Sequence, residues 1–142
     1  MSPRNVFLLG PLHIQDDANP PPPLRSQRTA ALLAYLVAQA RPVPRDALAA
    51  LLWPDADLAT GRANLRRELH NLNRILPGCW QIDRQAAHFV GSGETRIDLH
   101  EVRRLDEAGQ WREAAAWLRG GFMAGLNLDG SLEFETWLSG ER

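Results

Sequence analysis

Residues 62–76 read RANLRRELHNLNRIL, and their apolar side chains recur at helical spacing. Positions i, i+4, i+7 and i+11 form one narrow stripe of a helix with 3.6 residues per turn, and here they are Leu65, Leu69, Leu72 and Leu76. Polar and basic side chains occupy the opposite face and one shoulder of it: Arg67, His70, Asn71 and Arg74, with Arg66 and Asn73. The pattern predicts a helix that docks on a core through leucine and presents polar groups outward.

The residue types on that polar face suit a nucleic acid. Arginine and asparagine have the donor and acceptor geometry that fits guanine and adenine edges, and arginine also fits phosphate. The alternative is an ordinary solvated helix surface, and this stripe alone does not decide between the two.

Composition places the chain among globular proteins. It has 142 residues, of which 44% are hydrophobic and 23% charged, enough for one domain or for a small domain and part of another. All 16 basic residues are arginine, which a GC-rich coding sequence explains as well as phosphate binding does. A net charge of −1 argues against a protein that coats nucleic acid or membranes indiscriminately.

Charge divides the chain into two parts. Residues 1–96 hold 11 Arg against 8 acidic residues, and residues 97–142 hold 5 Arg against 9.

The single cysteine, Cys79, excludes an internal disulfide and fits a reducing compartment. The only apolar run near the N-terminus, residues 6–9, is broken by Gly10 and Pro11. We therefore expect a cytoplasmic protein with no membrane partner.

Local patterns predict the elements in order. A strand over residues 5–15, interrupted at Gly10, precedes Pro20–Pro23, which predicts a stiff connector or a short edge strand, with a proline-rich docking ligand as the alternative. Ser26 is a candidate N-cap for a helix that runs to about Gln39. Further helices are expected over residues 45–53 and about 58–76, the latter capped by Asp57 or Thr60.

Strand character returns after Pro77 and Gly78. Residues 79–90 predict a two-stranded ribbon, and residues 95–97 a further short strand. Helical patterns follow over 98–105, 111–119 and 132–138. The expected fold class is α+β: a winged helix-turn-helix whose third helix lies in a major groove and whose hairpin touches flanking DNA.

Several segments together resemble the bacterial antibiotic-regulatory-protein type of transcriptional regulator. In that family an OmpR-like winged helix precedes a bacterial transcriptional activation domain of tetratricopeptide-like helices. The similar segments are residues 6–12, 25–36, 44–48, 52–54, 63–69, 97–99, 120–126 and 134–138.

The resemblance implies a sequence-specific DNA-binding regulator, with a winged-helix domain over residues 1–97 and an incomplete start of the activation domain over 98–142. The helix at about 58–76 would read the major groove, and the hairpin at 80–91 would contact flanking DNA. Expected partners are double-stranded DNA, RNA polymerase and a second copy of the chain; no cofactor is expected.

The candidate contacts fall into three groups. The residues expected to read base edges are Arg67, His70 and Asn71. Arg66 and Arg74 are expected to contact either bases or the DNA backbone, and Asn73 lies with Arg66 on one shoulder of the same helix. Arg62 is a phosphate contact near the helix start. The remaining candidates are Arg84 and His88 on the hairpin, and Arg28 and Arg45 at the starts of the first two helices, where simple capping is the alternative.

An enzyme is not expected. The histidines and the cysteine lack metal-ligand spacing, and there is neither a glycine-rich phosphate loop nor a Gly-x-Ser-x-Gly motif. The tryptophans are expected to anchor cores: Trp53, Trp80, Trp111, Trp117 and Trp137. The competing interpretation is a protein-interaction module on the same scaffold, whose polar third helix meets an acidic protein.

Overall fold

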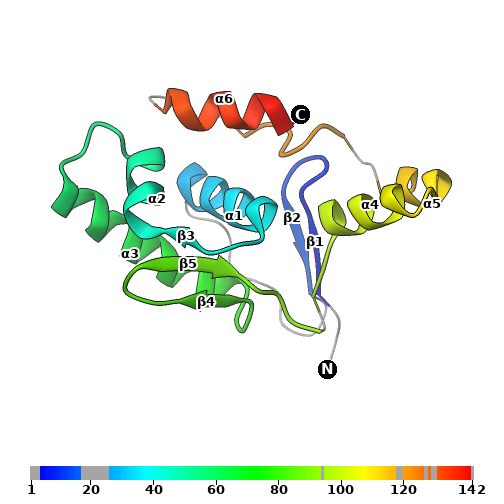
Figure 1. Ribbon diagram of the computed structural model, residues 1–142, viewed down its shortest axis with the longest axis horizontal. Coiled ribbons are helices and arrows are strands. Elements are labelled where there is room, and N and C mark those ends of the chain that lie inside the picture. Colours follow the sequence, from blue (N-terminus) through cyan, green and yellow to red (C-terminus); the bar gives the residue numbers. More distant parts are fainter. Residues whose placement is uncertain are drawn as a thin grey trace. The chain divides into compact units, whose positions relative to one another are not determined.

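Two three-stranded sheets and six helices are present in the computed structural model, which describes residues 4–16, 26–93, 95–117, 120–126, 128 and 131–141 (Figure 1). The chain divides into two compact units. The first unit takes its described residues from 4–16 and 93–126, and the second from 26–92 and 128–141. The predicted α+β class is confirmed.

The second unit is built around three consecutive helices. They are α1 (Gln27–Gln39), α2 (Arg45–Leu52) and α3 (Leu58–Ile75). Ser26 caps α1 as predicted, because its Oγ accepts the N–H of Thr29 at 3.2 Å. Of the two candidate caps for α3, Asp57 is the one used, and its Oδ1 accepts the N–H of Thr60 at 2.7 Å.

The predicted leucine stripe forms the buried side of α3. Its four residues are nearly or wholly inaccessible to solvent: Leu65, Leu69, Leu72 and Leu76. The helix packs against α1 and α2 through this side. After α3, Gly78 adopts a φ of +81°, a conformation that side chains with a Cβ rarely take, so the chain can turn sharply into the next strand.

The second unit's sheet has the order β3-β5-β4 and is antiparallel. Its strands are β3 (Val43–Pro44), β4 (Trp80–Ile82) and β5 (Ala86–Phe89), the last two being the predicted ribbon. Trp80 joins this ribbon to α3, because its indole N–H donates to the Leu72 carbonyl oxygen at 3.1 Å. The ring of Trp80 meets that of Phe89 edge-on at 5.2 Å, as expected for an anchor beneath the ribbon.

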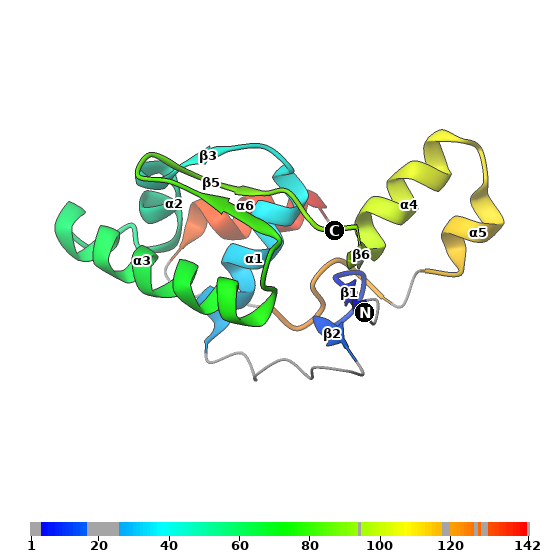
Figure 2. The same ribbon diagram turned by 90° about the horizontal axis from the view of Figure 1, so that it is seen from below.

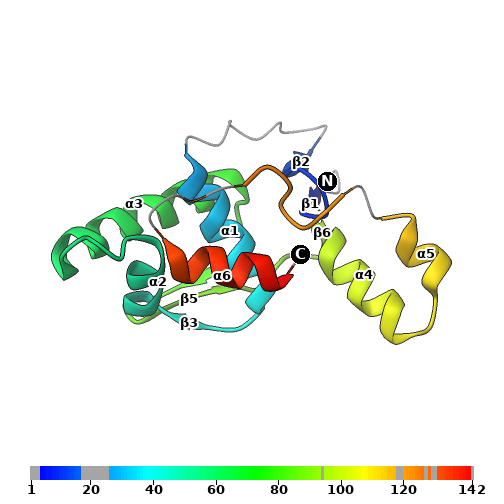
Figure 3. The same ribbon diagram turned by 90° about the horizontal axis from the view of Figure 1, so that it is seen from above.

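The last helix, α6 (Leu132–Glu141), also belongs to the second unit and packs against α2. Figure 3 shows it lying across α1 and α2. Phe134 and Leu138 are buried, while Trp137 is half-buried against Tyr35 of α1, with ring centroids 4.9 Å apart. At the start of the helix, the Ser131 hydroxyl donates to the Leu51 carbonyl oxygen.

The first unit holds the N-terminal strands. Its sheet has the order β2-β1-β6, from β1 (Arg4–Phe7), β2 (His13–Gln15) and β6 (Thr95–Ile97). β1 pairs antiparallel with β2 and parallel with β6. The chain continues from β6 directly into α4 (Asp98–Glu107), which packs against α5 (Trp111–Ala115).

The prediction for one tryptophan of the first unit is wrong. Trp111 was expected in a core, but it is 73% exposed, because it opens the five-residue helix α5 on a side that no described residue of its unit covers.

The segment Pro20–Pro23 lies outside the described residues. The division into functional domains at residue 97 stays a prediction. None of the described helices is both long and apolar enough to cross a bilayer.

Candidate nucleic-acid interface

The polar face of α3 is exposed along its whole length. The exposed side chains are Arg62, Arg66, Arg67, His70, Asn73 and Arg74, and Asn71 is half-buried. Figure 2 shows α3 running along the edge of its unit, beside α1, α2 and the β4–β5 hairpin. Within this unit the helix therefore has a leucine side turned inward and an arginine side turned to solvent, as predicted.

Asp57 fixes where this helix begins. Its carboxylate accepts backbone and side-chain hydrogen bonds from Thr60, which hold the pKa of Asp57 below its usual value. The charged form of the cap is thereby favoured at neutral pH. An acidic cap next to the positive end of the helix is also the favourable sign for the helix dipole.

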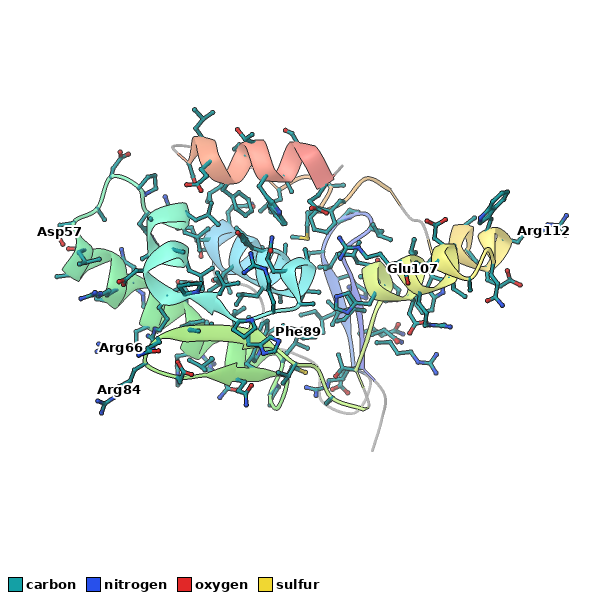
Figure 4. The ribbon with its side chains drawn as sticks, viewed as in Figure 1. Asp57, Arg66, Arg84, Phe89, Glu107 and Arg112 are labelled. Carbon is teal, nitrogen blue, oxygen red and sulfur yellow. The ribbon has the colours of Figure 1, made fainter. Side chains whose placement is uncertain are left out.

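Some arginines of the second unit are open to solvent without an acidic partner. Among the residues that the structure describes, Arg66, Arg74 and Arg84 form no ion pair. Figure 4 shows the side chains of Arg66, on α3, and Arg84, in the β4–β5 turn, projecting away from their unit on the same side. Exposed guanidinium groups from a helix and a neighbouring hairpin can both reach one polyanion.

Arg67 has a partner on its own helix. Its Nη2 donates to the side-chain oxygen of Asn64 at 3.0 Å, one turn earlier. Both side chains are at the surface, so this contact orients the guanidinium while leaving most of its donors available. Asn64 was not among the predicted site residues.

Arg62 is engaged by an acidic residue that the sequence analysis missed. Its Nε and Nη2 donate to the two carboxylate oxygens of Asp46 on α2, at 3.0 and 3.1 Å. These hydrogen bonds lower the pKa of Asp46 and raise that of Arg62. The signal available in the sequence was an acidic residue in the first turn of the preceding helix, but no local pattern pairs it with Arg62.

Two hydrogen bonds from Arg45, at the start of α2, hold the tip of the β4–β5 hairpin. Nη1 of Arg45 donates to the Asp83 carbonyl oxygen at 2.9 Å, and its backbone N–H donates to Gln85 at 2.8 Å. Asp83 closes the turn, because its carboxylate accepts the N–H groups of Gln85 and Ala86, which lower its pKa. The turn that presents Arg84 is therefore anchored to α2.

His88 lies on β5 opposite Gln81 of β4 and is half-buried. Arg28, at the start of α1, donates through Nε to the Leu52 carbonyl oxygen at 3.0 Å and lies 6.0 Å from the ring centre of Trp53. It thus ties α1 to the end of α2. These contacts give Arg28 and Arg45 a structural role in the unit, and a direct contact of either with DNA stays a prediction.

Comparison with known proteins adds a likeness in fold. No family model matches the chain, and no curated protein does. A solved structure described as Mycobacterium tuberculosis EmbR in complex with a low affinity phosphopeptide is similar to it, with a TM-score of 0.69 and 23% sequence identity. The match covers 99% of this chain and 42% of the EmbR chain, so the present chain spans about two fifths of that protein. This likeness supports a fold shared with the matched part of EmbR.

Proposed function

We propose that this chain is part of a sequence-specific DNA-binding transcriptional regulator. The second unit would act as a winged helix, with α3 in the major groove and the β4–β5 hairpin on the flanking backbone or minor groove. Arg67, His70 and Asn71 of α3 would supply the base contacts, and Arg62 near its start would contact a phosphate. Arg66, Arg74 and Arg84 would bind phosphates or bases.

The observation that carries this proposal is the two-sided character of α3. Its leucine side is buried and its arginine side is exposed over about five turns of helix. The order of three helices followed by a hairpin, and the likeness in fold to part of EmbR, support the same function.

The test is the loss of binding when two guanidinium groups of α3 are replaced. Binding sites are first selected from a random pool of duplexes with the wild-type chain. R67Q/R74Q is then expected to bind the selected duplex at least about 30-fold more weakly, since each base or phosphate contact contributes about 1–3 kcal/mol. Fluorescence anisotropy measures the affinity, and circular dichroism checks that helix content is unchanged.

The matched control is R104Q/R112Q, which removes two exposed arginines from α4 and α5. This pair is expected to bind the selected duplex within about twofold of wild type, because the proposal assigns no contact to the first unit. No enrichment of any duplex by the wild-type chain would refute the proposed function. Equal affinity of R67Q/R74Q and wild type would refute the role of α3.

A further inference from the structure

Asp46 is the acidic side chain that touches the arginine face of α3. The two Asp46 oxygens hold Nε and Nη2 of Arg62, a two-point geometry in which a guanidinium also binds phosphate. The Nε/Nη2 edge of Arg62, through which a guanidinium can bind a phosphate at two points, is therefore already occupied by a carboxylate.

The Asp46–Arg62 ion pair is exposed to solvent. The Arg62 side chain is 54% exposed and that of Asp46 is 60% exposed. An ion pair at this exposure contributes little to folding free energy, so exchanging one anion for another on Arg62 has a small cost. After the exchange, however, the unpaired Asp46 carboxylate would stay close to the bound phosphate and repel it.

We propose that Asp46 is an attenuator of DNA affinity, an inference that rests on the proposed function. Asp46 competes with a DNA phosphate for Arg62, and DNA binding requires this exchange. Because phosphate contacts carry no direct sequence information, Asp46 lowers affinity for every duplex about equally and leaves discrimination between sequences unchanged.

A purely structural role for the pair is the competing explanation. Other contacts already place α3: the buried leucine stripe, the Asp57 cap and the Trp80 indole on the Leu72 carbonyl. Neighbouring Arg45 separately ties α2 to the hairpin tip. Removing the exposed Asp46 carboxylate is thus expected to leave the position of α3 and the stability of the unit unchanged.

The experiment measures binding of the 142-residue chain to a labelled duplex of mixed sequence, about 30 base pairs long, at a series of salt concentrations. D46N is expected to bind about three- to tenfold more tightly than wild type at low salt. The slope of log affinity against log salt becomes steeper by up to about 0.9, because the Arg62 charge that neutralises one phosphate is no longer offset by the nearby Asp46 carboxylate. The gain from D46N is smaller in an R62Q background, since no guanidinium is released there.

E133Q is the charge-matched control, because Glu133 is an exposed acid on α6 of the same unit. It is expected to leave affinity and slope unchanged. Weaker or unchanged binding by D46N, an equal gain from E133Q, or a lowered unfolding midpoint of D46N would overturn the inference. If wild type binds no duplex, the proposed function itself fails; if wild type binds and D46N does not differ from it, only the inference fails.

Discussion

Asp98 joins two segments of the first unit through its side chain. It is fully buried, and its carboxylate accepts the N–H groups of Leu8 and Leu9, just after β1, and of Leu99 at the start of α4. The four donor–acceptor distances lie between 2.7 and 2.9 Å. One carboxylate thus satisfies three backbone donors that would otherwise be buried without partners.

Replacing Asp98 by asparagine is expected to destabilise the first unit by about 2–3 kcal/mol. The amide keeps only one oxygen, and its NH₂ group would face backbone N–H groups that need an acceptor. Hydrogen exchange read out at Leu8 and Leu9 measures the change. The control D106N alters an exposed acid on the same helix, α4, and should leave exchange at both positions unchanged. Unaltered protection in D98N would contradict the assigned role.

At the scale of elements, a buried hydrogen-bond chain joins α1 to α3. The Thr29 hydroxyl donates to the carboxylate of Glu68, and the Ser26 hydroxyl lies 3.1 Å from the Thr29 oxygen. Since the Thr29 proton is used by Glu68, Ser26 is the donor to Thr29. Glu68 lies on the side of α3 that faces α1 and is buried.

The valine substitution of Thr29 tests this link between elements. T29V keeps the shape of the side chain but removes the donor to a buried carboxylate, and it is expected to lower the free energy of unfolding by about 1–3 kcal/mol. Urea denaturation followed by circular dichroism gives the value. T136V, at an exposed threonine of α6, should change it by less than about 0.5 kcal/mol. Equal stabilities of T29V and T136V would show that the link contributes nothing.

Most elements could be predicted from local sequence, because their determinants are local. The leucine spacing located α3, and Ser26 and Asp57 marked the starts of α1 and α3. Long-range pairings could not be predicted in the same way. The Asp46–Arg62 ion pair and the partners of Asp98 join residues far apart in the chain, and no periodicity records which distant groups meet.

At the scale of the whole molecule, the distribution of charged side chains matters more for DNA binding than the net charge does. A net charge of −1 gives little general attraction to DNA, so binding must come from arginines gathered on one surface. If Arg62, Arg66, Arg74 and Arg84 each neutralise about one phosphate, the slope of log affinity against log salt is about −3 to −5.

That slope can be measured with wild type between about 50 and 200 mM salt, where affinity should fall roughly a hundredfold. A slope near zero would contradict a DNA interface made of these arginines. It would favour the protein-interaction alternative, whose contacts lack a strong counterion-release term.

The interleaving of the two units bears on any attempt to shorten the protein. The described residues begin in the first unit, pass to the second, return to the first, and continue in the second through α6. A fragment cut after Ile97 would lose Asp98, whose carboxylate accepts the N–H groups of Leu8 and Leu9. It would also lose α6, whose Phe134 and Leu138 are buried in the second unit. A minimal DNA-binding version should therefore be made by internal excision with a linker that retains α6, since a C-terminal truncation would expose hydrophobic surface on α1 and α2.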